Sequence, residues 1–412
     1  MRIAIANTWH DDNKGDCGIV VGIISLLQDR YPQAKFTLIS MFAQSSPFYH
    51  RAHRHLQELF PQLDIVPSPF FNHDTQQATA YQKIAKFFPI PLSLLFLQLP
   101  LSARHPGLQA IKNADLVISS GGQYLRASEN QYKSLYVFFR LLYPLLVARK
   151  YGVPYMFFSQ SFEFDAASRI DSRLMKLLCD RAIAVWAREP LSYKALQELA
   201  VLPQKIALVP DAAISIVPDK SDRVSDLLTQ HNLNSNPFWV ITVKDCQSHT
   251  RSLLSQMTQL IEQLLADGTV SQLVLISNSQ GPTTTEDDRL VARQLAKKLE
   301  GKPIAAIEAD LTPNELAAIY GAAEFVIGTR FQSLVLALAA RTPVYGISYA
   351  GYKVKGLMKM LGMPELYSSV ENIEADRIVK QVGALDLPKL KQEVCQQVEL
   401  HQQQLHKAIA LI

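Results

Sequence analysis

Short, almost wholly apolar segments alternate with helical segments along the chain, and this alternation most constrains the fold. Strands that are apolar on both faces are typical of a parallel sheet covered by helices on both sides. In the first half we predict strands at 2–6, 35–40, 64–66, 115–119, 155–159, 182–187 and 206–209. Residues 215–237 are polar and rich in turn-forming residues, which predicts a linker.

The same alternation restarts after the linker. Strands are predicted at 238–243, 273–277, 303–307, 325–327 and 344–347, with helices at 250–267, 285–299 and 312–321. A chain of 412 residues is long enough for two domains. We therefore predict two doubly wound, Rossmann-like α/β domains, at 1–215 and 237–375, followed by a helical segment at 376–412. Such sheets bind ligands at the carboxyl ends of their strands, which places the expected ligand site in a cleft between the domains.

Composition narrows the possible functions. The charges nearly balance, with a net charge of +4, so nucleic acid is not an expected partner. The four cysteines lie far apart, which argues against a zinc site or a disulfide framework and favours a reducing, cytoplasmic location. The chain shows no signal-peptide pattern and no uninterrupted apolar run of membrane-spanning length. No metal site is expected, and the histidines at 50, 53 and 55 are expected to face solvent.

Two apolar stretches, at 87–101 and 135–148, are interrupted by prolines. Both are predicted to be buried core helices, because short apolar runs usually are. The first has an alternative interpretation as a patch that contacts a membrane surface.

The loop after the first strand contains Asn13, Lys14, Gly15 and Asp16. Glycine allows close backbone approach to a ligand, and the helix that follows attracts anions at its N-terminus. Asp16 has an alternative structural role as the N-cap of that helix.

Further polar residues follow two buried strands of the first half. Gly121, Gly122 and Gln123 resemble a ligand-cradling turn, although paired glycines are also common in ordinary turns. Ser159, Gln160 and Ser161 end the next strand, and they offer hydrogen bonds to sugar hydroxyls.

Two arginines also follow buried strands: Arg188 in the first half and Arg330 in the second. A guanidinium suits a carboxylate or a phosphate, and its alternative role is a salt bridge to a local acid. Ser333 opens the helix after Arg330, and Lys353 follows the next strand as a further anion contact. One arginine from each domain favours a binding role.

Taken in order, these segments resemble the polysaccharide pyruvyl transferase family. The resemblance rests on N-K-G-D at 13–16, D-L-V-I-S-S-G-G at 115–122, S-Q-S at 159–161, R-E-P-L-S at 188–192, V-P-D at 209–211, I-G-T-R-F-Q-S at 327–333 and P-V-Y-G-I-S-Y at 343–349. It implies a GT-B-like arrangement, with the acceptor on the N-terminal domain and the donor on the C-terminal domain.

The resemblance also implies a chemistry. Members transfer the enolpyruvyl unit of phosphoenolpyruvate onto two sugar hydroxyls, forming a pyruvate ketal and releasing phosphate, with no cofactor. Arg188 and Arg330 would hold the donor, Lys353 would assist, and Asp16 would act as a base or position the acceptor. A lipid-linked acceptor would bring peripheral membrane contact. A homo-oligomer is compatible with the sequence.

Gln332 departs from the family pattern, which usually reads R-x-H at 330–332. Glutamine cannot exchange a proton near neutral pH. Three interpretations stay open: an introduced inactivating substitution, another proton donor such as His10 or Glu189, or a different transfer reaction. The competing hypotheses are a GT-B glycosyltransferase that uses a nucleotide sugar, with Glu371 or Glu374 as its carboxylate, and a non-catalytic binding protein.

Overall fold

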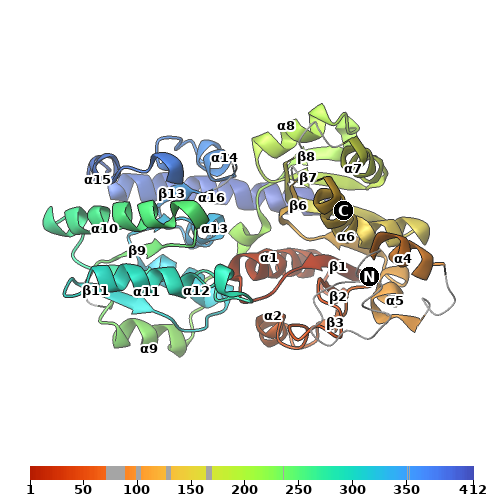
Figure 1. Ribbon diagram of the computed structural model, residues 1–412, viewed down its shortest axis with the longest axis horizontal. Coiled ribbons are helices and arrows are strands. Elements are labelled where there is room, and N and C mark those ends of the chain that lie inside the picture. Colours follow the sequence, from red (N-terminus) through yellow and green to blue (C-terminus); the bar gives the residue numbers. More distant parts are fainter. Residues whose placement is uncertain are drawn as a thin grey trace. The chain divides into compact units, whose positions relative to one another are not determined.

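The computed structural model describes residues 1–70, 89–98, 104–126, 131–163, 169–234, 236–349, 351 and 353–412. The chain divides into two compact units (Figure 1). Unit 1 comprises Met1–Asp11, Ile19–Ala212 and Leu405–Ile412, and unit 2 comprises Asp12–Gly18 and Ala213–Gln404. Each unit is built on its own parallel sheet with interleaved helices, which confirms the predicted α/β class.

The sheet of unit 1 has the strand order β3-β2-β1-β4-β6-β7-β8, and β5 pairs with β6. Its strands are β1 (Arg2–Thr8), β2 (Lys35–Ser40), β3 (Asp64–Val66), β4 (Leu116–Ser119), β5 (Gly122–Arg126), β6 (Tyr155–Glu163), β7 (Ala184–Ala187) and β8 (Ile206–Leu208). Its helices are α1 (Lys14–Arg30), whose first turn belongs to unit 2, α2 (Arg54–Leu59), α4 (Pro89–Phe96), α5 (Pro106–Lys112), α6 (Gln131–Lys150), α7 (Arg169–Arg181) and α8 (Pro190–Glu198).

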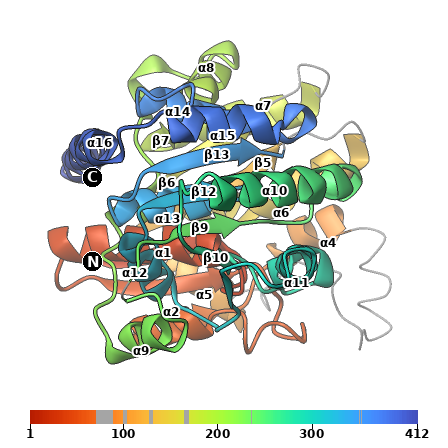
Figure 2. The same cartoon turned by 90° about the vertical axis from the view of Figure 1, so that its left-hand side faces the viewer.

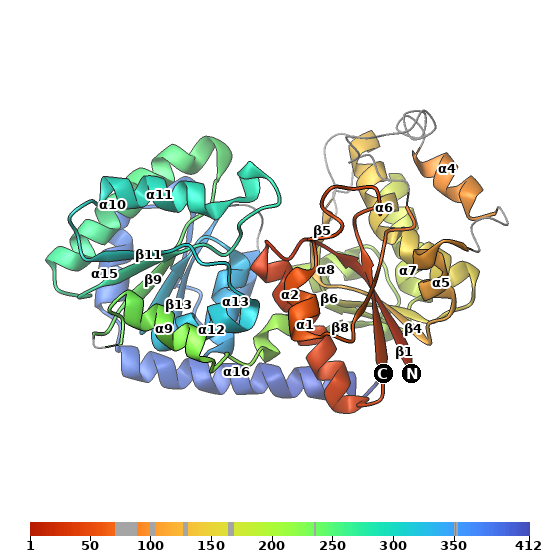
Figure 3. The same ribbon diagram turned by 90° about the horizontal axis from the view of Figure 1, so that it is seen from below.

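The sheet of unit 2 has the order β11-β10-β9-β12-β13-β14, with helices on both sides (Figure 3). Its strands are β9 (Trp239–Thr242), β10 (Leu273–Ile276), β11 (Ile304–Ile307), β12 (Phe325–Gly328), β13 (Val344–Ser348) and β14 (Tyr367–Ser369). Its helices are α9 (Asp222–Gln230), α10 (Thr250–Ala266), α11 (Asp288–Lys298), α12 (Pro313–Ala322), α13 (Phe331–Ala339), α14 (Lys353–Met360), α15 (Ala375–Gly383) and α16 (Leu387–Ile409), all labelled in Figure 2. The end of α16, from Leu405, belongs to unit 1.

All predicted strands are present, and two more are added. β5 begins at Gly122 and was read as a turn, because two glycines precede a polar segment. β14 has only three residues, two of them serine, so it contains no apolar run from which a strand could be predicted. Both strands form through backbone pairing with a neighbouring strand: β5 pairs with β6, and β14 pairs with β13.

The expected linker at 215–237 contains a helix, α9, which the sequence analysis did not predict. Val224 is buried, while Arg223 forms an ion pair with Glu315 at 2.7 Å. The backbone of Asp219 also donates to the carbonyl of Asn314. One apolar face suffices to dock this helix on α12, and the rest of its surface stays polar.

The N-terminus of α12 forms a capping box, in which the side chains of Thr312 and Glu315 each bond the other's backbone N–H. Thr312→Ala removes one of these two hydrogen bonds. It is expected to lower the free energy of unfolding, as measured by urea denaturation, by about 1 kcal/mol. Ser221 precedes α9 in the same position but makes no cap bond, so Ser221→Ala is the control. An equal loss in both variants would contradict the capping explanation.

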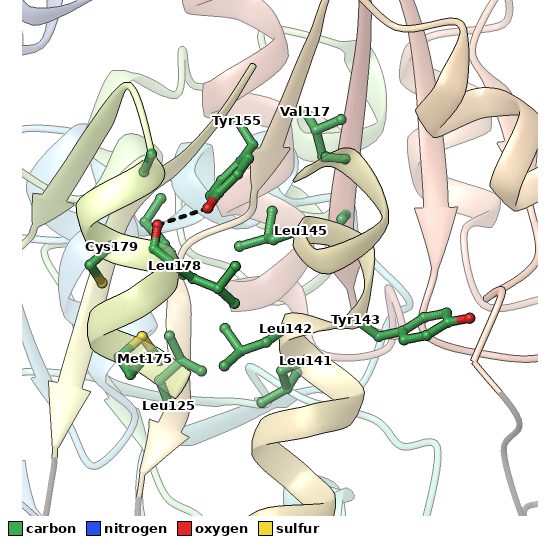
Figure 4. Packing of buried hydrophobic residues seen from close by; sticks show 14 of the residues in the cluster. Val117, Leu125, Leu141, Leu142, Tyr143, Leu145, Tyr155, Met175, Leu178 and Cys179 are labelled. Atoms are coloured by element: carbon green, nitrogen blue, oxygen red, sulfur yellow. Dashed lines mark hydrogen bonds between the residues drawn. The ribbon is translucent and has the colours of Figure 1, made fainter. Parts of the chain in front are cut away.

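The apolar stretch at 135–148 is buried in α6, as predicted. Leu141, Leu142 and Leu145 pack against Met175 and Leu178 of α7 in the core of unit 1 (Figure 4). The stretch at 87–101 lies partly outside the described residues, and its described part contains α4. Leu94 and Leu95 of α4 are 42% and 55% exposed, so the buried interpretation is wrong for both. In the part of the chain that the structure describes, no helix has the length and hydropathy needed to span a membrane.

Candidate functional site

The carboxyl ends of β1, β4 and β6 carry a chain of buried amide and hydroxyl groups in unit 1. Asn7 Nδ2 donates to Ser119 Oγ at 2.9 Å, and Ser119 Oγ donates to Gln160 Oε1 at 3.4 Å. Gln160 is fully buried, and its Nε2 has no hydrogen-bond partner among the described residues. A buried donor without a partner is costly, so this amide is a natural contact for a ligand oxygen.

Arg188 extends this polar edge at the end of β7. Its Nη1 contacts Asp211 Oδ2 at 2.6 Å, and its Nε donates to Ser161 Oγ at 2.7 Å. The guanidinium is buried, with 4% of the residue exposed. The local salt bridge that the sequence left as an alternative is therefore present, and Asp211, the Asp of V-P-D, is its partner.

Glu189 lies beside this pair with only 1% of the residue exposed. Ser161 Oγ donates to its Oε2 at 3.0 Å, and Ser192 Oγ donates to its Oε1. Burial raises the pKa of the Glu189 carboxyl, and the neighbouring Arg188 guanidinium opposes part of the rise. This carboxyl therefore holds its proton at a higher pH than an exposed glutamate does.

The other predicted residues of unit 1 mainly shape the backbone. A Cβ at Gly121 would lie 2.8 Å from the carbonyl oxygen of Ser159, so only glycine allows this approach. Ser159 has a positive φ of 44°, and its Oγ donates to the Pro210 carbonyl at 2.6 Å. Gly122 opens β5 at φ 140°, and Gln123 Nε2 donates to Glu163 at 3.1 Å.

Arg330 is held by Asp288 in unit 2. Its Nε lies 2.9 Å from Asp288 Oδ2, and its Nη2 lies 2.6 Å from Oδ1, which gives a two-pronged ion pair. Burial alone would lower the pKa of Arg330, but the Asp288 carboxylate outweighs it and the net pKa is raised. Burial raises the pKa of Asp288, and the facing guanidinium opposes this. Arg330 thus stays charged, with a partner that the sequence analysis did not identify.

Two lysines flank the ring of Tyr349 near Arg330. Lys244 Nζ lies 3.6 Å from the ring centroid, and Lys353 Nζ lies 5.3 Å from it and 3.5 Å from the phenol oxygen. Lys353 is also 5.8 Å from the ring of Phe331. Burial lowers the pKa of Lys244, partly opposed by Tyr349, and the nearby Arg330 lowers it further. These contacts gather three cations at the carboxyl edge of this sheet.

Lys244 is the residue that the sequence analysis missed. It lies two residues beyond β9, at the same edge as Arg330 beyond β12 and Lys353 beyond β13. The sequence carries a signal for it, because Lys244 follows the end of the buried strand β9.

The loop with Asn13, Gly15 and Asp16 belongs to unit 2 by its contacts. Lys14 Nζ contacts Asp310 Oδ1 at 2.7 Å, and the backbone of Asn13 bridges Ser279. Asn13 Oδ1 accepts from the Gly15 N–H at 3.1 Å, and Asn13 Nδ2 donates to Asp16 at 2.8 Å. The helix begins at Lys14, so the N-cap role left open for Asp16 is wrong; Asn13 makes that cap bond.

Gln332 packs directly on this loop. A Cβ at Gly15 would lie 2.4 Å from both Cβ and Cγ of Gln332, so glycine is required where the two segments meet. Gln332 is 9% exposed at the start of α13. The Ser333 hydroxyl is taken up within unit 2: its Oγ donates to the Arg330 carbonyl at 2.7 Å and bonds Thr242 Oγ1 at 2.9 Å.

Two expected surface histidines are buried, which corrects the sequence analysis. His53 and His55 are 2% and 4% exposed, and only His50 lies in solvent. His53 Nε2 bonds Ser40 Oγ at 2.8 Å, which ties the start of α2 to β2. Among the described residues no group of His, Cys, Asp and Glu is arranged to hold a metal ion.

The remaining candidates divide between surface and core. Glu371 and Glu374, the carboxylates considered for a glycosyltransferase, are both exposed. His10 is fully buried, edge-on to Phe42 with 5.9 Å between ring centroids. A cavity of about 470 Å³ lies at the opposite, amino end of the sheet of unit 1, and Arg2 and Lys35 line it. None of the predicted site residues reaches that cavity.

Comparison with known structures supports the fold. Anabaena Alr3699/HepE, solved in complex with UDP-glucose, superposes with a TM-score of 0.58 at 14% identity, covering 100% of this chain and 98% of that one. The UDP-GlcNAc 2-epimerase from Methanocaldococcus jannaschii gives a TM-score of 0.56 at 12% identity, covering 94% and 93%. At these identities the likeness concerns the two-domain GT-B-like fold.

Sequence comparison identifies the family. The amylovoran biosynthesis protein AmsJ of Erwinia amylovora is 22% identical over 422 aligned positions, covering 97% of this chain and 96% of AmsJ. The sequence model described as polysaccharide pyruvyl transferase matches residues 13–351, which extend from the Asn13 loop past Arg330 and Tyr349. This chain belongs to the polysaccharide pyruvyl transferase family.

Proposed function

We propose that this protein transfers the enolpyruvyl unit of phosphoenolpyruvate onto two hydroxyls of a sugar, in a polysaccharide or its lipid-linked precursor. Both hydroxyl oxygens bond to C2 of the donor, and the bond from C2 to the phosphate oxygen breaks. One hydroxyl proton is in effect transferred to C3, which becomes a methyl group, and the other hydroxyl proton leaves with the phosphate. The product is a cyclic pyruvate ketal, and no cofactor or metal is part of the proposal.

The cation cluster of Lys244, Arg330 and Lys353 is the observation that carries this proposal. Phosphoenolpyruvate presents a carboxylate and a phosphate close together, and three cations at one sheet edge match that charge. Asp288 neutralises part of the charge of Arg330, and Lys244 and Lys353 supply the other two positive charges of the cluster. Because Tyr349 lies against both ammonium groups, it holds them in place while leaving their charge intact.

The polar edge of unit 1 is proposed to bind the acceptor. Gln160 Nε2 and the hydroxyl of Ser161 suit sugar hydroxyls, and Arg188 is proposed to bind an anionic group. Asp16 is proposed to position an acceptor hydroxyl. Since Gln332 cannot carry a proton, Glu189 is the proposed proton carrier, and its raised pKa supports this.

Calorimetric titration with phosphoenolpyruvate tests the donor site. Lys244→Met is expected to weaken binding about tenfold or more, because a charge-assisted contact to an anion is worth roughly 1.5–3 kcal/mol. Lys297→Met removes an exposed lysine from α11 and is the matched control, with no change expected. A parent protein that binds no phosphoenolpyruvate, or a Lys244→Met variant that binds it normally, would contradict the assignment.

Phosphate release separates the proposal from its competitors. A pyruvyl transferase releases phosphate only when phosphoenolpyruvate and a suitable glycan are both present. Saturable binding of a nucleotide sugar, with none of phosphoenolpyruvate, would point to glycosyl transfer instead. Binding of phosphoenolpyruvate without turnover on any glycan of a broad acceptor panel would support the non-catalytic alternative.

A further inference from the structure

Basic residues outnumber acidic ones in the segments that contain α4, α5 and α6 of unit 1. The chain as a whole has 41 Lys and Arg against 37 Asp and Glu. Residues 75–114 nevertheless contain four Lys or Arg and no acid, and residues 130–162 contain another four and no acid. These segments include α4, α5 and α6, and α6 contacts both α4 and α5 (Figure 3). An excess of basic residues of this kind favours an anionic partner.

The outer face of α4 carries exposed apolar side chains. Ser93 and Leu97, one turn apart, are 0% and 7% exposed and face α6. Tyr143 of α6 donates to the Ser93 carbonyl at 2.7 Å, and Lys150 donates to the Leu97 carbonyl at 2.6 Å. These contacts fix the orientation of the helix, so that Leu94 and Leu95 project outward, 42% and 55% exposed.

Four exposed cations lie on or next to the adjoining helices: Arg104, two residues before α5, and Lys112, Arg149 and Lys150. Among the described residues, none of these four side chains has a carboxylate within 4.0 Å that would offset its charge. Lys112 and Lys150 approach the ring of the half-buried Tyr151, at 5.6 and 5.8 Å from its centroid. Lysines beside a tyrosine and exposed leucines are the groups that anchor a protein at a bilayer interface.

We propose that Leu94, Leu95, Arg104, Lys112, Arg149 and Lys150, here termed the α4–α6 patch, bind the surface of an anionic lipid bilayer. The leucines enter the boundary between headgroups and acyl chains, and the cations contact lipid phosphates. An acidic protein partner would satisfy the cations alone, whereas a bilayer also accommodates two neighbouring leucines with no charge between them. The patch lies wholly within unit 1.

Sedimentation with vesicles tests the proposal, and it needs neither donor nor acceptor, so this proposal and the proposed function can fail separately. The parent protein is expected to pellet with vesicles of phosphatidylglycerol and phosphatidylcholine at low salt, and much less with phosphatidylcholine alone or at high salt. Leu94→Gln/Leu95→Gln should lower the partition coefficient at least tenfold, since each buried leucine contributes about a factor of ten. Lys112→Gln/Arg149→Gln should lower it by roughly fivefold per charge removed.

Matched variants keep the test specific. Leu290→Gln/Leu400→Gln removes two leucines that are 40% and 50% exposed in unit 2, and Lys297→Gln/Lys298→Gln removes two exposed lysines of α11. Both should bind vesicles as the parent does, and the thermal unfolding midpoints of all variants should stay close to the parent's. A parent protein that stays in the supernatant with anionic vesicles overturns the proposal. So does equal loss of binding in the control variants, or a dimer that depends on Leu94 and Leu95 without vesicle binding.

Discussion

Arg330→Met is expected to lower the free energy of unfolding by about 3–5 kcal/mol, because it leaves a buried carboxylate without its counter-ion. The Asp288 side chain is 2% exposed, and its two oxygens accept from Arg330 at 2.6 and 2.9 Å. Methionine preserves most of the packing volume of the stem, so the loss reports mainly the unpaired charge. Urea denaturation measures it.

The pH dependence of this loss identifies its cause. Burial already raises the pKa of Asp288, and removal of Arg330 takes away the main opposing charge. A carboxyl with a raised folded-state pKa binds more protons in the folded state, so it destabilises the fold as pH rises above the unfolded pKa of about 3.9. The penalty in Arg330→Met should therefore be smaller at pH 5 than at pH 8.

Two further variants control this experiment. Asp288→Asn/Arg330→Met removes both charges and should recover part of the lost stability. Arg293→Ala disrupts the exposed pair with Glu308 in the same unit and should leave the unfolding free energy nearly unchanged. A loss in Arg330→Met that is independent of pH, with no recovery in the double variant, would show that packing and not charge is responsible.

Gln332→His is expected to raise the rate of phosphoenolpyruvate-dependent phosphate release by about 10²-fold or more. Glutamine can donate a hydrogen bond but cannot transfer a proton, and a positioned general acid contributes roughly 10²–10⁴-fold. Position 332 lies at the start of α13, two residues from Arg330 and in contact with Gly15, so an imidazole there adjoins the proposed donor site. The change is measured as kcat with a saturating glycan acceptor.

A pH–rate profile separates proton transfer from a change of shape. The histidine variant should gain a dependence on a group that titrates near the ordinary histidine pKa of about 6.5, whereas Gln332→Asn should gain neither rate nor pH dependence. An unchanged or lower rate in Gln332→His would show that a proton donor at position 332 does not assist the reaction. In either case Glu189→Gln should abolish the activity of the parent, because Glu189 is its proposed proton carrier.

The sequence predicted the strands because their signal is local. A buried parallel strand must be apolar at nearly every position, so β2 and β3 begin and end at the predicted residues. Within each sheet all strands run parallel, so the residues that follow them lie at one edge of that sheet. This placement predicted a ligand-binding role for Gln160 and Arg188 in the first half of the chain, and for Arg330 and Lys353 in the second. The Asn13 loop was predicted to bind a ligand as well, and its contacts place it in unit 2.

The tertiary structure alone decided which groups meet. Asp211 is 23 residues from Arg188, and Asp288 is 42 residues from Arg330, so no local pattern connects these ion pairs. The burial of His53 depends on Ser40 in another element, and the exposure of Leu94 depends on how Tyr143 holds α4. The apolar period of a strand is a property of adjacent residues, whereas charge pairing and solvent exposure depend on segments that only packing brings together.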